Sequence, residues 1–120
     1  MCVRAIRGAI QVDSNTVEDI HGGVKELLPE ILRANGITTD SVISVILTAT
    51  PDLTADFPAA AARDIGFGGV PLLCASEIAV PGALPRVIRV MLHCTTDHPA
   101  SEITHVYLKG AISLRRDLAQ

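Results

Sequence analysis

Aromatic residues are almost absent from this sequence of 120 residues, at 2 %, and there is no tryptophan. The hydrophobic core must therefore be aliphatic, and a hydrophobic fraction of 48 % makes such a core possible. That fraction argues against a disordered chain, and the length suits a single domain over residues 1–120. Phe57, Phe67 and Tyr107 are the only aromatic residues, so each is available for a special role.

The sequence also lacks the marks of an exported or membrane-bound protein. It has three cysteines, and an odd number argues against a disulfide framework. No uncharged apolar run reaches the roughly 18 residues of a membrane span. Charges interrupt the first apolar segment, unlike the core of a secretion signal. We therefore expect a reduced, cytoplasmic protein with no membrane partner.

Positive charge is scarce, and arginine carries most of it. The net charge is −3 and no run of basic residues resembles a nucleic-acid footprint, so nucleic acid is not an expected partner. Arginines outnumber lysines by eight to two. The planar guanidinium fork suits carboxylates and phosphates, although codon bias would give the same ratio.

Hydrophobic spacing predicts the element order β-α-β-α-β-β-β. Thr16 is the predicted cap of the long helix, with Asp19 as its capping-box partner. We expect an α+β fold, with one long and one short helix packed mainly on one face of a mixed sheet. The segment 42–49 is apolar almost throughout, which suits a strand covered on both faces. Strands are expected over 2–12, 42–49, 70–75, 86–96 and 104–114, a long helix over 16–34, and a short helix from Pro58.

Two arginines lie within predicted strands, among apolar residues. Arg7 shares its strand face with Ala5 and Ala9, and Arg89 shares its own face with Met91. An isolated guanidinium on an apolar sheet face is costly unless it is paired. Each arginine could instead lay its stem along the sheet and keep its head in water. Two of them on neighbouring strands favour a bound dianion.

A second candidate site lies where the strand over 70–75 ends, with Cys74, Ser76 and Glu77 within four residues. Residues at strand ends often line a cleft, so these side chains suggest polar contacts to a small ligand. A cysteine nucleophile would need a base, and His93 is the only nearby candidate in the sequence. A buried, inert thiol is the competing interpretation of Cys74.

Phe57 follows a polar loop and precedes the short helix. A phenylalanine in this place usually packs against the helix that follows. The alternative is an apolar lid over a ligand, with Arg63 one helical turn further on.

No pattern of a metal or cofactor site is visible. The four histidines have no recurring ligand spacing. The glycines at 66–69 lack the helix and lysine that follow in a phosphate loop. We expect neither a metal nor a cofactor, and the residues alone predict a domain that binds a small polyanion.

Five segments, together covering most of the chain, occur in the order and spacing of a known enzyme family. They are RAIRGA at 4–9, LTATPDLTADFPAAAAR at 47–63, VPLLCASEIAVPGALPRVIRVM at 70–91, TD at 96–97 and HVYLKGAISLRRDL at 105–118. The sequence resembles the AroH class of chorismate mutases. It departs from some relatives at Ala60, where they have a lysine, so one charge at the mouth of the site is absent.

The resemblance implies an isomerase that converts chorismate to prephenate by an intramolecular [3,3] rearrangement, in aromatic amino acid biosynthesis. It implies no cofactor, metal or covalent intermediate. It also implies a ferredoxin-like subunit that assembles into a homotrimeric pseudo-barrel, with one site at each subunit interface.

The resemblance further implies roles for single residues. Arg7 and Tyr107 would hold a substrate carboxylate. Arg89 would donate to the ether oxygen, and Glu77 would accept from the ring hydroxyl. The remaining expected contacts are Leu73, Cys74, Ala75 and Ser76 along the same wall, Phe57 and Ala59 against the ring from the neighbouring subunit, and Arg63, Leu114 and Arg115 at the mouth.

Two other functions stay open at this point. Enamine/imine deaminases of the Rid family are also small trimers of similar fold with an interfacial arginine, although their discriminating segments are not visible in this chain. The other alternative is a non-catalytic module that binds a carboxylated metabolite.

Overall fold

The computed structural model describes residues 1–115 of the chain, except for the side chain of Arg115. No helix in this part is long and apolar enough to cross a membrane. The strands are β1 (Cys2–Gln11), β2 (Val42–Ala49), β3 (Leu72–Ser76), β4 (Val87–Thr96) and β5 (Val106–Leu108); the helices are α1 (Val17–Asn35) and α2 (Pro58–Ala62), with the short helical turns η1 (Thr39–Ser41), η2 (Arg63–Phe67), η3 (Ala100–Glu102) and η4 (Lys109–Arg115).

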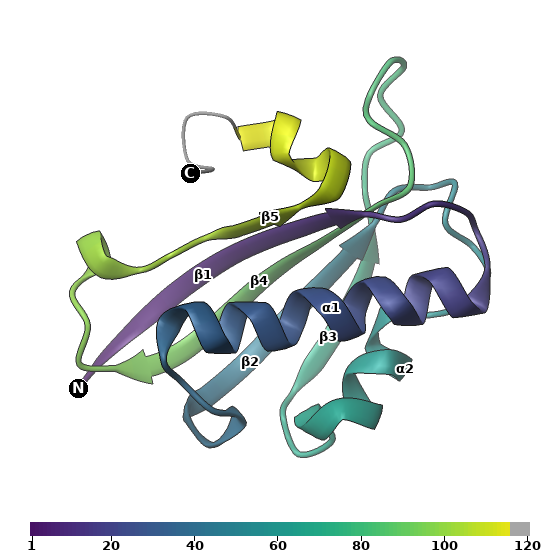
Figure 1. The fold of residues 1–120 in the computed structure, drawn as a ribbon. Coiled ribbons are helices and arrows are strands. Elements are labelled where there is room, and N and C mark those ends of the chain that lie inside the picture. The colour runs from purple at the N-terminus through teal and green to yellow at the C-terminus, as the bar shows by residue number, and fades with distance from the viewer. Residues whose placement is uncertain (116–120) are drawn as a thin grey trace.

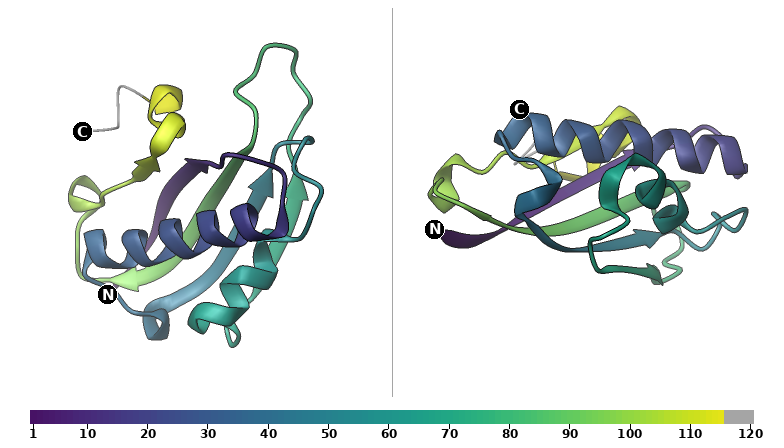
Figure 2. Two further views of the ribbon diagram at one scale, coloured as in Figure 1. Left: turned by 45° about the vertical axis from the view of Figure 1, so that its right-hand side comes forward. Right: turned by 90° about the horizontal axis from the view of Figure 1, so that it is seen from below.

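The strands form one mixed sheet in the order β3-β2-β4-β1-β5. β4 is antiparallel to both of its neighbours, β1 and β2, whereas β3 and β5 pair in parallel at the two edges. Figures 1 and 2 show α1 running across one face of the sheet, with α2 beside it on the same face. The predicted α+β fold is thus confirmed, with its helices on one face.

Both ends of α1 lie within one residue of the predicted range 16–34. Thr16 is the N-cap, and its hydroxyl accepts a hydrogen bond from the Asp19 backbone N–H at 3.1 Å. The carboxylate of Asp19 accepts from the Ser14 hydroxyl at 2.6 Å instead of closing the capping box. Gly36 ends the helix with a φ of +62°, a conformation that favours glycine.

The core lies between α1 and the sheet and is aliphatic, as the scarcity of aromatics predicts. Phe67 is the one aromatic side chain among the largest fully buried ones of the described residues. On β4, burial alternates: Val90 and Leu92 are buried on the helix side, whereas Arg89 and Met91 are half-buried on the other face. Among the described residues, neither α1 nor α2 covers that second face, and η4 packs on it only near Ala9 and Val87, so Ile46 of β2 stays 37 % exposed.

Two adjacent glycines of α1 give opposite predictions for stability. A Cβ on Gly22 would meet open space, whereas a Cβ on Gly23 would lie 2.6 Å from the Val12 Cγ1 atom. Replacing Gly22 with alanine should raise the free energy of unfolding by about 0.5–1 kcal/mol, because alanine loses less entropy in a helix. Gly23→Ala should lower it by about 1–3 kcal/mol through overpacking.

Urea unfolding at one fixed protein concentration measures both changes. The two variants differ by one position and carry the same substitution, so each is the control for the other. Equal shifts in the same direction would contradict the packing argument.

The strand expected over 104–114 is wrong for most of its length. β5 contains only Val106–Leu108, and Lys109 then takes a φ of +55°, which turns the chain out of the sheet. The apolar residues that suggested a strand belong to η4 instead. There Ala111 is buried against Ala9 and Val87, and this tertiary contact replaces strand pairing.

Candidate active site

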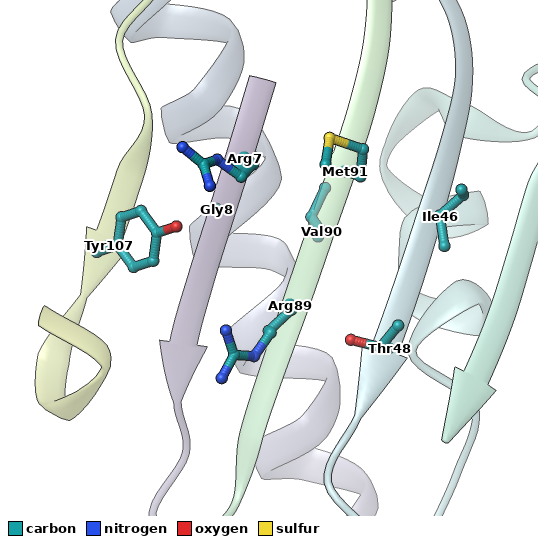
Figure 3. A pocket seen from close by; sticks show the side chains of 8 residues that line it. All are labelled: Arg7, Gly8, Ile46, Thr48, Arg89, Val90, Met91 and Tyr107. Atoms are coloured by element: carbon teal, nitrogen blue, oxygen red, sulfur yellow. The ribbon is translucent and has the colours of Figure 1, made fainter. Parts of the chain in front are cut away.

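The sheet face turned away from α1 carries both strand arginines. Arg7 is paired with Met91 and Arg89 with Ala9, so the two arginines lie diagonally on neighbouring strands and on one face. Tyr107 of β5 is paired with Ala9 on the other side. Figure 3 shows the two guanidinium groups and the phenol on this face. They line a hollow of about 230 Å³. The structure thus brings together the three residues expected to bind anionic oxygen atoms.

Glu77 is bound by two residues that line this hollow, Arg89 and Thr48. Arg89 Nε donates to one carboxylate oxygen of Glu77 at 3.1 Å, and the hydroxyl of Thr48 donates to the other at 2.7 Å. Thr48 is paired with Arg89 across β2 and β4. The side chain of Glu77 is 19 % exposed and that of Arg89 is 43 % exposed. Because both oxygens of Glu77 have donors, its carboxylate is fixed relative to Arg89.

Arg7 is fixed through its backbone and leaves its charge available. Its N–H donates to the Nδ1 atom of His105 at 2.9 Å, which joins β1 to the residue before β5. The guanidinium of Arg7 is half-buried and has no carboxylate within ion-pair distance among the described residues. A half-buried cation without an anionic partner attracts an anionic ligand more strongly than one in bulk water.

A second hollow, of about 500 Å³, lies where β3 ends and the loop before α2 begins. Phe57 lines it and is 69 % exposed. It therefore does not pack against the helix that follows it, α2, as a phenylalanine in this position usually does. Cys74, Ala75 and Ser76 line the same hollow. Within one chain, these residues stand apart from Arg7 and Tyr107.

A third hollow, of about 470 Å³, adjoins Glu77 and Arg89 on their other side. Leu114 of η4 closes one flank of it. The rest comes from the loop between β3 and β4, which projects from the sheet in Figures 1 and 2 and exposes Ile78 and Val80. Leu114 and Arg89 therefore line the same hollow, and the role of Leu114 at the mouth of the site stays a prediction.

The other predicted contact residues lie outside these three hollows in the described part of the chain. Ala59 is buried within α2, and Arg63 at the start of η2 is exposed. Leu73 is 61 % exposed on the open face, beside its strand partner Ile46. The side chain of Arg115 lies outside the described residues.

The geometry does not favour cysteine nucleophilic catalysis. Cys74 is paired with the buried Leu47 and packs against the core on the helix side of the sheet. His93 lies on the opposite, open face, where its Nδ1 atom is 3.5 Å from the Ser44 hydroxyl. Burial raises the pKa of the Cys94 thiol, so that thiol stays protonated. Among residues 1–115, no three His, Cys, Asp or Glu side chains are grouped as metal ligands.

Sequence reasoning missed the middle of the arginine hollow. Thr48, Ile46 and Met91 line it, and Thr48 holds Glu77. The signal was present, because Ile46 and Thr48 alternate with the buried Val45 and Leu47 along β2. Because residues 42–49 are apolar almost throughout, this alternation between the two faces was not recognised from the sequence.

Comparison with known proteins identifies the family. The model of the family chorismate mutase type I matches residues 3–118. The chain belongs to this family. Chorismate mutase AroH of Thermus thermophilus is 54 % identical over 97 % of this chain and 96 % of the relative, and chorismate mutase AroH of Bacillus subtilis strain 168 is 43 % identical over 99 % and 94 %.

A solved structure supports the same family assignment. The chorismate mutase from Clostridium thermocellum superposes with a TM-score of 0.90 at 47 % identity, covering 92 % of this chain and 98 % of that chain. Chorismate mutase, an isomerase of aromatic amino acid biosynthesis, is therefore the function that the comparisons support. The predicted function is confirmed over the imine deaminase and the non-catalytic module.

Proposed function

We propose that this chain rearranges chorismate to prephenate in the hollow formed by Arg7, Arg89 and Tyr107. The observation that carries the proposal is the convergence of two guanidinium groups and a phenol on an open sheet face (Figure 3). Chorismate is a dicarboxylate with an ether oxygen and a ring hydroxyl. Its pericyclic rearrangement needs no nucleophile and no base, so the site has only to supply donors, acceptors and shape.

Arg7 and Tyr107 bind one substrate carboxylate in this proposal. The Tyr107 hydroxyl points toward β1, between the two guanidinium groups, and the Arg7 guanidinium has no carboxylate partner among the described residues (Figure 3). A hydrogen bond from a charged donor to a carboxylate is about twice as strong as a neutral one. The pair would therefore hold the substrate in one orientation.

Arg89 stabilises the charge that develops as the ether bond breaks. Its Nε atom is occupied by Glu77, so the two terminal nitrogens remain for the ether oxygen. Glu77, held by Thr48 and Arg89, also accepts a hydrogen bond from the ring hydroxyl in this proposal. Both side chains are in place before the substrate binds, so little reorganisation is needed during the reaction.

The energies required are modest. The lower end of enzymatic rate enhancement corresponds to about 8 kcal/mol of barrier lowering. One preorganised donor to a developing oxyanion supplies about 3–4 kcal/mol. The remainder would come from holding the compact, pseudo-diaxial substrate conformer that places the reacting carbon atoms together.

The second wall of the site comes from a neighbouring copy in this proposal. Phe57 and Ala59 would pack against the ring across the interface from Arg7 and Arg89, and the strand end at 73–76 would complete that wall. Two observations support this arrangement. The Phe57 hollow is separate from the arginine hollow within one chain. The open face of β2 also exposes apolar side chains that a second subunit would cover.

We therefore propose a homotrimer with one site at each interface. Arg63, Leu114 and Arg115 would close the mouth, where Ala60 adds no charge. All three cysteines are free thiols, which suits the reducing cytoplasm. We place the enzyme there, with chorismate as its only small-molecule partner and without a metal or cofactor.

The loss of ultraviolet absorbance of chorismate tests the chemistry. We expect purified protein to turn over chorismate without added cofactor, and Cys74→Ser to keep kcat within about tenfold of wild type, since a removed nucleophile typically costs far more. The thiol packs against the core and has no histidine beside it, so serine should replace it with little loss.

Complete loss of activity in Cys74→Ser, with the fold intact by circular dichroism, would point to covalent chemistry. Tight binding of prephenate by wild-type protein without turnover of chorismate would instead favour the non-catalytic module.

A further inference from the structure

The loop of Phe57, which lines the second hollow, is joined to α1 and the segment before it by contacts that the proposed reaction does not use. We infer that Asn15, His21 and Asp56 are positioning residues that hold the loop of Phe57 against α1, and we call these three residues the loop latch. The inference rests on the proposed role of Phe57 as the wall against the substrate ring. The inference adds the residues that hold Phe57 in position.

Phe57 needs such a device because its own side chain does not anchor it. It is 69 % exposed, although it precedes the short helix α2. As the N-cap residue of α2, it makes no side-chain capping hydrogen bond. Its position therefore depends on how the backbone of the preceding loop is held.

Asn15 holds the first half of that loop. Its side-chain oxygen accepts from the backbone N–H groups of Thr54 and Ala55, both at 2.9 Å. Its side-chain nitrogen donates to the Thr54 hydroxyl, also at 2.9 Å. One amide thus binds two consecutive residues of the loop to the segment just before α1, 39 and 40 positions away in sequence.

Asp56 holds the second half and contacts Phe57 directly. One of its carboxylate oxygens accepts from the Phe57 backbone N–H at 2.7 Å, and the other is 2.7 Å from the His21 Nε2 atom. Both side chains are mostly buried, at 29 % and 21 % exposure. A single carboxylate therefore connects the backbone of Phe57 to a side chain of α1.

The helix end of the latch is rigid. Ile20 and Val24, on either side of His21, are fully buried in the core under α1. The hydrogen bond from His21, aided by that from the Phe57 N–H, holds the pKa of Asp56 below its usual range, so the carboxylate stays ionised at neutral pH. Hydrogen bonds to a charged acceptor are stronger than those between neutral groups, which suits Asp56 as the centre of the latch.

The latch has a specific kinetic consequence. Without it, the loop would populate the competent position for only a fraction of the time, and apparent substrate affinity falls by that fraction. Once substrate is bound, Phe57 is in place and the chemical step is unchanged. Loss of the latch should therefore raise KM and leave kcat nearly constant.

Asp56→Ala is the direct test, because it removes both bonds of the carboxylate. We expect KM for chorismate to rise about three- to tenfold with kcat within about twofold of wild type. Asp56→Asn should restore most of the affinity, since its amide oxygen can still accept from Phe57 and its amide nitrogen can donate to His21. His21→Leu, made on the other side of the latch, should raise KM in the same way.

Lys25→Met is the matched control. Lys25 also joins α1 to the region after α2, through an ion pair of 3.9 Å with Asp64, but this pair does not contact the Phe57 loop. We expect it to leave KM unchanged. A rise in KM equal to that of Asp56→Ala would indicate a general effect of loosening α1 and would overturn the inference.

A double-mutant cycle separates the latch from the role of Phe57. If Asp56 acts through Phe57, adding Asp56→Ala to Phe57→Ala should raise KM no further. If Phe57→Ala alone leaves KM unchanged, the proposed role of Phe57 is wrong. If Phe57→Ala raises KM but Asp56→Ala does not, or the two effects multiply, the latch is wrong and the role of Phe57 stands.

Discussion

Replacing Arg89 with lysine should lower kcat by about 100- to 1000-fold, the range found for the loss of one preorganised donor to a developing oxyanion. The KM for chorismate should change much less. Lysine keeps the positive charge and so keeps most of the attraction for a dianion. It loses the planar fork, which in this structure lets one nitrogen bind Glu77 while two others remain for the substrate.

Steady-state kinetics with chorismate decide this prediction. Arg4→Lys is the matched control, because Arg4 is likewise a strand arginine, on the neighbouring β1, but donates to the His98 carbonyl outside the three hollows. It should behave like wild type. An Arg89→Lys enzyme with a kcat near wild type would rule out the role of Arg89 at the ether oxygen.

Two inactive variants should restore activity when they are mixed. In the proposed trimer, each site takes Arg89 from one subunit and Phe57 from the next. Arg89→Ala and Phe57→Asp should each be nearly inactive, since one removes the donor and the other places a carboxylate against a dianionic substrate. If the two are unfolded and refolded together in equal amounts, about one quarter of the sites receive both native residues.

The expected activity is therefore about a quarter of that of wild type carried through the same refolding. Separately refolded variants, mixed only in the assay, are the control and should stay inactive. If both residues belonged to one subunit, no mixed assembly would contain an intact site. Persistent inactivity of the co-refolded sample would thus contradict the shared site.

Much of the fold could be predicted because its signals are local. The stripe of apolar residues along α1, the Thr16 cap and Gly36 at its end require no knowledge of distant residues. The β-branched run of β2 is equally local, and its predicted bounds match the structure. The prediction of a strand over 104–114 was wrong because most of its apolar residues do not pair in the sheet. They pack against β1 and β4, and the backbone turn at Lys109 depends on that packing.

The residues of the candidate site also fall into those that a local pattern identifies and those that depend on distant partners. Arg7 and Arg89 were visible as arginines in apolar strands, and alternation alone put each on its face. Thr48 was not visible, because a threonine in a strand is ordinary until Glu77, 29 residues later, is found 2.7 Å from its hydroxyl. The same holds for Asn15 and Asp56, whose meaning depends on the partners that the fold brings to them.

By itself, the sequence determined the residue types, their faces and the family to which their order corresponds. Periodicity and capping act over a few residues, so they are legible without coordinates. Only the tertiary structure decided which faces meet. It paired β1 with β4, so that both arginines share one hollow with Tyr107, and it put Cys74 and His93 on opposite faces of the sheet. Such pairings depend on contacts between residues far apart in the chain, which no local pattern encodes.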